Sequence, residues 1–247
     1  MVKPMMKQPH IGVDSTQIAP RVIVCGEPDR ANRIAALFDN AELVSENREY
    51  RVFTGTYQGQ SVSVCSTGIG APSMIIAVEE LKQCGVTDVI RVGSAGAMQS
   101  GIQLGELIVA EGAVRDEGGS KAYVRSSYPA YASFSLLKAL DSYLAEKEAR
   151  YHLGVVRSHD SFYTDDEEAI CKYWNKKGIL GGDMETSALF TVGRLRGLNV
   201  ASILNNVVLY QQDVKEGVGQ YVDEAQVMME GERLASYAAL EALIAQS

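Results

Sequence analysis

The feature that most constrains the fold is a repeated pattern in which a short apolar run ends in a loop of small residues. The runs at 21–25, 61–66 and 88–94 each end in a glycine-containing loop, and the first two loops lead into segments of helical character. In open α/β sheets, ligands bind where strands end in loops of this kind. The pattern therefore predicts an α/β fold whose strand ends converge on one crevice.

An arginine, Arg91, stands just ahead of the third loop, which runs over Gly93–Gly96. A guanidinium at the end of a buried strand is costly to desolvate unless an anion meets it. Glycines let backbone N–H groups approach that anion, and the hydroxyl of Ser94 is a further donor. Gly26 and Arg30 stand where the first strand passes into a helix, whose positive end favours anions. We expect two anion-binding junctions, with an ordinary salt bridge as the alternative for Arg91.

The remaining segments follow the periodicity of strands or helices. We predict further strands at 42–57, 105–114, 152–158 and 200–208, and helices at 28–38, 73–84, 133–147 and 224–245, with another that opens near 183. In the helix at 133–147, an apolar stripe of Phe134, Leu137, Leu140 and Leu144 should pack on the sheet. Residues 1–20 contain three prolines and are expected to form an extended N-terminal arm. Because no linker is visible, residues 1–247 are expected to form a single domain.

The composition narrows the kind of partner. The formal net charge of −8 argues against a nucleic-acid surface, which needs a positive face, so converging arginines should serve a small anion. The four cysteines show no spacing typical of a zinc site, and no metal site is predicted. No stretch approaches the length of about 18 apolar residues that a membrane span requires. We therefore expect a cytoplasmic protein that binds neither membrane nor nucleic acid.

Four motifs, in this order, resemble the nucleoside phosphorylase I family, in its branch of hexameric purine nucleoside phosphorylases and uridine phosphorylases. They are Gly26-Glu-Pro-Asp-Arg30, Ser66-Thr-Gly-Ile-Gly-Ala-Pro-Ser73, Arg91-Val-Gly-Ser-Ala-Gly-Ala97 and Asp183-Met-Glu185. The resemblance implies a three-layer α/β/α sandwich with a mixed, partly barrel-like central sheet. It also implies phosphate-dependent cleavage of the N-glycosidic bond of a nucleoside, which gives free base and ribose 1-phosphate. Inorganic phosphate is the co-substrate, and neither a metal nor an organic cofactor is expected.

The resemblance assigns site residues at the positions that match the motifs. Those expected at the phosphate are Gly26, Arg30, Arg91, Ser94 and, from the adjacent subunit, Arg48. Those expected at the ribose are Met184, Glu185 and, from the neighbouring subunit, His10. Those expected at the base are Ala95, Gly96, Phe162 and Gln211. Catalysis is expected to rest on Arg30, Arg91 and Glu185, and the donated residues imply at least a dimer and, by the resemblance, a homohexamer.

The residues expected near the base depart from both branches of the family. Purine enzymes of this branch carry an aspartate just after the last central strand, where this chain has Val208. Uridine enzymes carry a Gln-x-Arg pair shortly after the stacking phenylalanine, where this chain has 163–168 without either residue. Amides such as Gln211 or Gln212 can read uracil instead. We therefore predict a divergent uridine phosphorylase, with a purine nucleoside phosphorylase as the alternative, ahead of a hydrolytic nucleosidase or a non-catalytic nucleoside-binding protein.

Overall fold

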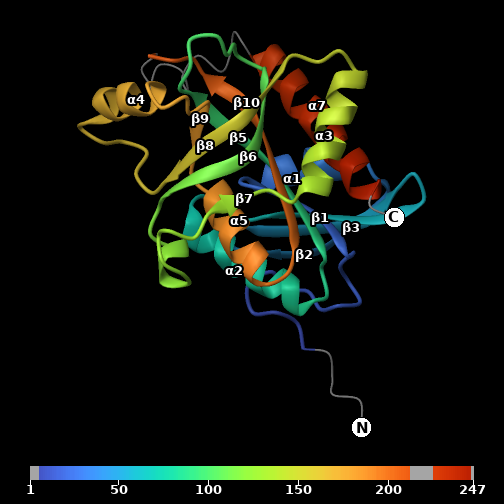
Figure 1. The fold of residues 1–247 in the computed structure, drawn as a ribbon. Helices are drawn as coiled ribbons and strands as arrows, with labels where there is room; N and C mark the ends of the chain where they lie inside the picture. The colour runs from blue at the N-terminus through green and yellow to red at the C-terminus, as the bar shows by residue number, and fades with distance from the viewer. Residues whose placement is uncertain (1–5, 212–224, 246–247) are drawn as a thin grey trace.

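The computed structural model describes residues 6–211 and 225–245 (Figure 1). Its strands are β1 (Arg21–Cys25), β2 (Asp39–Asn47), β3 (Tyr50–Tyr57), β4 (Gln60–Ser66), β5 (Asp88–Ala97), β6 (Leu107–Asp116), β7 (Ala130–Tyr131), β8 (Tyr151–His159), β9 (Gly181–Asp183) and β10 (Asn199–Val208). Its helices are α1 (Pro28–Ala35), α2 (Ala71–Gln83), the short 3-10 helix η1 (Ser120–Ala122), α3 (Phe134–Glu146), α4 (Glu167–Asn175), α5 (Thr186–Leu195) and α7 (Ala225–Ile244).

The strands form one sheet of mixed direction, part of which closes on itself. β5 pairs in parallel with β10 along its length, whereas its opposite edge pairs first with β1 and then, at Gly96 and Ala97, with β9. Because β10 also pairs with β6, β6 with β8 and β8 with β9, these strands and β5 form a closed ring. β4, β3 and β2 extend the sheet beyond β1. The mixed, partly barrel-like sheet expected from the resemblance is confirmed.

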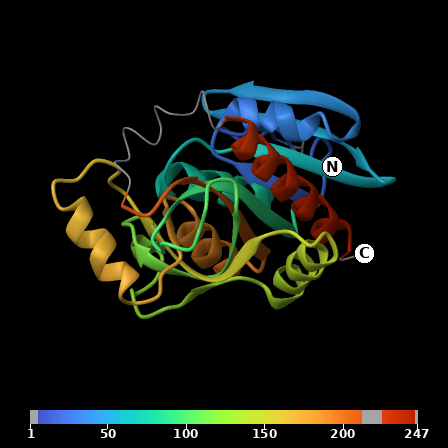
Figure 2. The same cartoon turned by 90° about the horizontal axis from the view of Figure 1, so that it is seen from above.

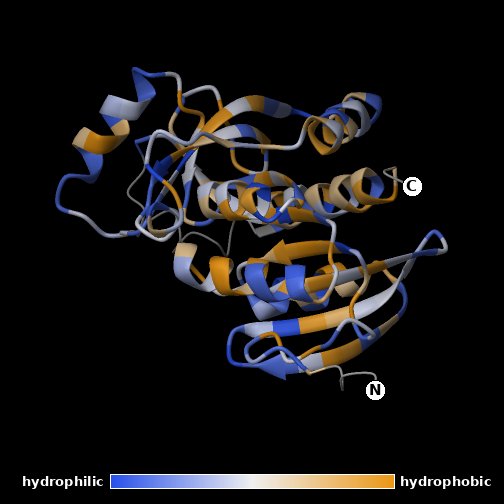
Figure 3. Ribbon diagram, turned by 60° about the horizontal axis from the view of Figure 1, so that its bottom comes forward, coloured by the Kyte–Doolittle hydropathy of each residue, from blue (hydrophilic) through white to orange (hydrophobic). Residues whose placement is uncertain are grey.

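Helices cover both faces of this sheet. α2 and α5 pack on one face, and α1, α3 and α7 pack on the other (Figures 1 and 2). Each face of the sheet has its own hydrophobic core. Successive side chains of a strand point to opposite faces, so Val89 of β5 lies in one core and its neighbour Ile90 lies in the other. The covering helices carry both hydrophobic and hydrophilic residues along their length (Figure 3). The α/β/α sandwich is therefore confirmed, with the ends of its central strands open on one side.

Two predicted elements are wrong in detail. The segment 42–57 is not one strand, because the chain reverses at Arg48, which has a φ of +55°, so that β2 and β3 form a hairpin. The tight turn keeps the same alternation of side chains, so periodicity alone does not reveal it. In α3, Leu136 is buried with Leu140 and Leu144, while Phe134 is 78% exposed. Phe134 lies two residues ahead of that series and so faces away from the sheet.

Residues 6–20, expected to form an extended arm, run in turns along the sheet. Ile11 and Val13 of this segment are fully buried in the core that contains α2.

Within residues 6–211 and 225–245, no helix is both long and apolar enough to span a bilayer. In the same part of the chain, no cluster of three or more His, Cys, Asp or Glu side chains is arranged to hold a metal ion.

Candidate active site

A cavity of about 1340 Å³ opens where β1, β5, β9 and β10 end. It brings together most of the residues that the resemblance assigns to phosphate, ribose and base. Those that line it are Gly26, Arg30, Arg91, Ser94, Ala95, Gly96, Phe162, Met184, Glu185 and Gln211. His10 and Arg48 do not line it, and Gln212 lies outside the described residues. The convergence of strand ends that the sequence predicted therefore produces one crevice.

Arg91 lies on β5 and is only 3% exposed. Its Nε donates to Oδ2 of Asp183 at 3.1 Å, and its Nη2 donates to Oε2 of Glu185 at 2.5 Å. Two carboxylates of this chain are thus the anions that make the buried guanidinium tolerable. Gly93 leaves room for the side chain, since a Cβ there would lie 2.6 Å from Cζ of Arg91. The glycine that was expected to admit an anion therefore also admits the arginine.

Arg30 reaches the same cavity from the first turn of α1, a helix that begins at Pro28 as predicted. Its Nη2 donates to Oγ of Ser94 at 2.8 Å, and its Nη1 donates to the carbonyl of Val92 at 3.4 Å. The guanidinium is therefore held against β5 itself, because β5 continues through Gly93–Gly96, which the sequence predicted to be a loop. The two anion-binding junctions expected from the sequence are therefore parts of a single site.

Glu185 immediately precedes α5, but its side chain makes no capping hydrogen bond to that helix. Its Oε1 accepts from the N–H of Gly70 at 2.5 Å, and its Oε2 accepts from Arg91. Asp183 instead accepts from the first N–H of α5, that of Thr186, at 3.0 Å. Gly70 has a φ of +93°, a backbone conformation that favours glycine. Gly70 and Arg91 thus hold this carboxylate, which is 4% exposed. Burial raises the pKa of Glu185 against the opposing effect of Arg91.

Other wall residues come from the segment between β8 and α4 and from the end of β10. Two of them are apolar, Phe162, which is 41% exposed, and Val208, which is only 6% exposed. Glu167 has one buried carboxylate oxygen, Oε2, without a hydrogen-bond partner among the described residues. Nδ1 of His159 lies 2.9 Å from the carbonyl of Ser161, which can only accept, and burial lowers the pKa of this histidine. A neutral ring that donates from Nδ1 presents Nε2 as an acceptor.

Several candidate residues were missed by reasoning from the sequence. Asp183 belongs to one of the four motifs, but the ordinary role of an acidic residue at a helix start is capping. In the structure Asp183 accepts from the first N–H of α5 and also from Nε of Arg91. His159 directly follows the strand predicted at 152–158 and belongs to none of the four motifs, so only the fold brings it to the cavity wall. Glu232 contacts Arg30 across 202 positions of sequence, a separation at which no local pattern signals a contact.

His10 and Arg48 lie away from the cavity of their own subunit. Nδ1 of His10 lies 2.6 Å from Oε1 of Glu80, and Arg48 stands exposed at the turn between β2 and β3. This placement is compatible with donation to a second copy of the chain. Their roles in the site stay predictions.

Comparison with known proteins places this geometry in a family. Residues 20–236 match the family model of the phosphorylase superfamily. The solved structure of a uridine phosphorylase from Vibrio fischeri ES114 is 70% identical with a TM-score of 0.93, and the match covers 99% of this chain and 100% of that one. A guanosine phosphorylase from Halorubrum lacusprofundi is 39% identical over 199 residues, 81% of this chain and 82% of that protein. A uridine phosphorylase from Thermococcus kodakarensis is 39% identical over 208 residues, 79% of this chain and 75% of that protein. The family expected from four short motifs is confirmed, and this chain belongs to the phosphorylase superfamily.

Proposed function

We propose that this protein is a nucleoside phosphorylase that cleaves uridine with inorganic phosphate and releases uracil and ribose 1-phosphate. The observation that carries the proposal is the approach of two buried arginines, Arg30 and Arg91, to a cavity that also holds Ser94 and Glu185. Relatives named uridine phosphorylase, at 70% and 39% identity, support uridine as the nucleoside.

The phosphate dianion would lie among Arg30, Arg91, the hydroxyl of Ser94 and the backbone N–H of Gly26. One oxygen of hydrogen phosphate attacks the anomeric carbon of the ribose while the bond to the base nitrogen breaks, and that bonding electron pair leaves with the base. The ribose develops oxocarbenium character as this happens. The base nitrogen then takes up the proton that the phosphate group gives up. The guanidiniums are held before substrate arrives, so positioning and preorganised charge supply most of the rate acceleration. The reaction is a group transfer in which nothing is oxidised or reduced.

Glu185 would hold the sugar. A carboxylate can accept about four hydrogen bonds, and Glu185 uses one on Gly70 and one on Arg91. The remaining lone pairs suit the adjacent 2′ and 3′ hydroxyls of ribose. Its negative charge would also stabilise the positive charge that develops on the ribose ring. This role requires an ionised Glu185, which the nearby guanidinium of Arg91 favours against burial.

The charges of one subunit do not by themselves attract a phosphate dianion. The guanidiniums of Arg30, Arg33 and Arg91 are paired with the carboxylates of Glu27, Glu232, Asp183 and Glu185. Phosphate binding would be favoured by another cation, and Arg48 of a neighbouring subunit is the residue that the family resemblance assigns. We therefore propose a shared site in a dimer at least, and a homohexamer by the same resemblance.

The base would pack on Phe162 and Val208, which cannot exchange protons with it. Glu167 lines the same cavity, and a carboxylate there suits an N–H donor such as N3 of uracil, which lies between two carbonyls. Guanine carries N–H donors on its corresponding edge as well. Because a relative named guanosine phosphorylase is 39% identical, guanosine is the second candidate substrate.

The test is the release of base from uridine, thymidine, inosine, guanosine and adenosine, each with and without inorganic phosphate. We expect uridine to be cleaved only when phosphate is present, with ribose 1-phosphate as the second product. Cleavage without phosphate would indicate a nucleosidase, and binding of nucleosides without any cleavage would refute catalysis. Preference for guanosine or inosine would replace uridine with the purine candidate.

The shared site has its own test in a mixture of two inactive variants. We expect Arg48→Ala and Arg91→Met each to lose phosphorolysis. When the two are denatured and refolded together, mixed dimers should regain activity, because one of their two sites receives an intact Arg48 and an intact Arg91. A fully active monomer, or an Arg48→Ala variant with unchanged kinetics, would contradict the shared site.

A further inference from the structure

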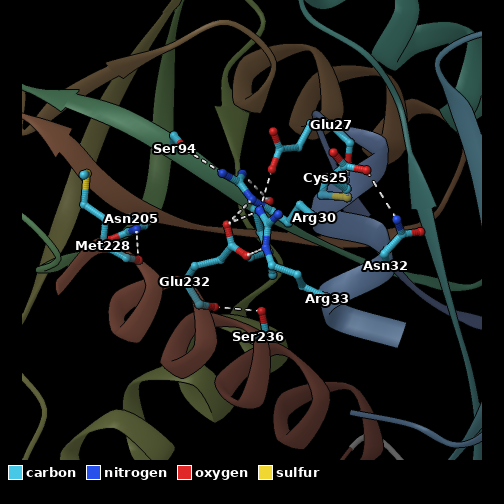
Figure 4. Close-up of polar contacts among 12 residues, drawn as sticks. Cys25, Glu27, Arg30, Asn32, Arg33, Ser94, Asn205, Met228, Glu232 and Ser236 are labelled. Carbon is cyan, nitrogen blue, oxygen red and sulfur yellow. Dashed lines mark hydrogen bonds and ion pairs between the residues drawn. The ribbon is translucent and has the colours of Figure 1, made fainter. Parts of the chain in front are cut away.

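Glu232, on the C-terminal helix α7, lies behind the proposed phosphate site and holds two arginines at once (Figure 4). Its Oε2 accepts from Nε of Arg30 at 2.8 Å and from Nη2 of Arg33 at 2.9 Å. Its Oε1 accepts from Nε of Arg33 at 2.5 Å. Glu232 is 8% exposed and Arg30 is 9% exposed, so this is a largely buried ion pair in which a missing partner would be costly.

The helix that carries Glu232 is seated tightly on the sheet. A Cβ at the preceding residue, Gly231, would lie 2.4 Å from Oδ1 of Asn205 and 2.5 Å from the carbonyl of Gly105. Nδ2 of Asn205, on β10, donates to the carbonyl of Met228 at 2.8 Å (Figure 4). Only glycine permits this approach of α7 to β10 at that point. The carboxylate of Glu232 therefore projects from a fixed backbone.

Each nitrogen of the Arg30 guanidinium has a different acceptor. Nε is directed to Glu232, Nη1 to the carbonyl of Val92 and Nη2 to Oγ of Ser94. A guanidinium is planar, so the bond at Nε sets the plane in which Nη1 and Nη2 lie. The bond to Glu232 thus determines which way Arg30 presents its outer nitrogens to the cavity.

Glu232 remains ionised across the neutral range. Burial alone would raise the pKa of Glu232, but the guanidiniums of Arg33 and Arg30 outweigh burial and lower it. A permanent negative charge beside a phosphate site repels phosphate, so Glu232 by its charge alone would weaken phosphate binding. Its hydrogen bond to Nε of Arg30 can offset this effect by orienting the guanidinium toward the phosphate.

We propose that Glu232 is a positioning residue that aims Arg30 at the phosphate, so that its loss weakens phosphate binding although it removes a negative charge. This inference rests on the proposed phosphate-dependent reaction. Without the carboxylate, Nε of Arg30 loses a buried acceptor and the two arginines lose the anion that separates their charges. The orientation of Arg30 then relaxes, and the contact with Ser94 is no longer enforced.

The experiment compares Glu232→Gln with Glu241→Gln, a matched control on the same helix. Glu241 accepts hydrogen bonds from Tyr57 and Gln58 at 2.8 Å, and it does not line the cavity. Because charge-assisted hydrogen bonds orient and strengthen such pairs, we expect Glu232→Gln to raise the KM for phosphate about tenfold while the KM for nucleoside changes little. Glu241→Gln should leave both unchanged. Circular dichroism of each variant establishes that it is folded.

A second comparison separates positioning from a general structural role. In an Arg30→Met background, Glu232→Gln should add less than about a twofold effect, because two residues that act through one contact are not additive. An equal further loss in that background would overturn the proposal, since Glu232 would then act independently of Arg30. An unchanged or lowered phosphate KM in the single variant would overturn it as well, because the carboxylate would act only as a repelling charge.

The phosphate affinity is also measured without nucleoside, by isothermal titration calorimetry of the wild type and Glu232→Gln with inorganic phosphate. If the wild type binds phosphate but cleaves no nucleoside, the proposed function fails. The two Kd values would still test whether Glu232 positions Arg30 for phosphate binding. We expect the Kd to rise by the same factor as the KM. Equal Kd values for the two proteins would refute the positioning role.

Discussion

Gly93→Ala tests whether Arg91 is held where the structure places it. The added Cβ would lie 2.6 Å from Cζ and Nη2 of Arg91 and 2.7 Å from Cδ2 of Leu204. The Leu204 methyl can move, but the guanidinium is pinned by Asp183 and Glu185. Overpacking of this kind costs about 1–3 kcal/mol, and breaking a buried ion pair costs about 3–5 kcal/mol. We expect the free energy of unfolding to fall by about 2 kcal/mol, with partial repacking that displaces Arg91.

A displacement of about 1 Å in a positioning group can reduce the rate about 100-fold. We therefore expect a loss of that order in kcat/KM for phosphate-dependent uridine cleavage, alongside the drop in stability measured by urea denaturation. Gly101→Ala is the matched control, because a Cβ there meets no described atom within 4 Å and the residue is exposed. Its stability should stay within about 0.5 kcal/mol of wild type. A Gly93→Ala protein with wild-type stability and kinetics would show that Arg91 is not confined against Gly93.

Other predictions address the sugar, acid stability and the core. Glu185→Gln should lower kcat/KM for uridine about 100-fold. The loss should be smaller with 2′-deoxyuridine, which lacks one of the hydroxyls that Glu185 would bind. Equal losses on the two nucleosides would count against this role. The pKa of Glu232 is lowered in the folded protein, so this group stabilises the fold above 4.5, the ordinary pKa of a glutamate, and the stabilisation is lost as the pH falls through the lowered pKa. Between pH 5 and pH 3, the free energy of unfolding measured by urea denaturation should therefore fall less in Glu232→Gln than in the wild type. Leu140→Ala should lower the free energy of unfolding by about 2–5 kcal/mol. Phe134→Ala should change it by no more than about 0.5 kcal/mol, because Phe134 is 78% exposed. Thermal and urea unfolding measure both values, and equal losses of stability would refute the observed orientation of α3.

The local elements were largely predictable from the sequence, because their signals are local. Apolar runs identified the strands β1, β4 and β5, although β5 continues through the loop predicted at Gly93–Gly96, and Pro28 marked the start of α1 as observed. The turn at Arg48 escaped notice because the alternation of side chains continues through a tight hairpin. The short strand β9 escaped for a related reason, since Gly181 and Gly182 have no side chains to carry a periodic pattern.

The sequence by itself also determined which chemistry the site can hold, because guanidinium, carboxylate and glycine at strand ends are chemical properties of the residues. It did not determine how those groups pair, since pairing depends on contacts between residues far apart in the chain. Only the tertiary structure places Glu185 against Arg91 and the N–H of Gly70, 94 and 115 positions away. Glu232 is the clearest case, because nothing near it in sequence distinguishes it from the exposed Glu230. Its burial against Arg30 follows from the close approach of α7, at Gly231, to Asn205 and Gly105, which lie far from it in sequence.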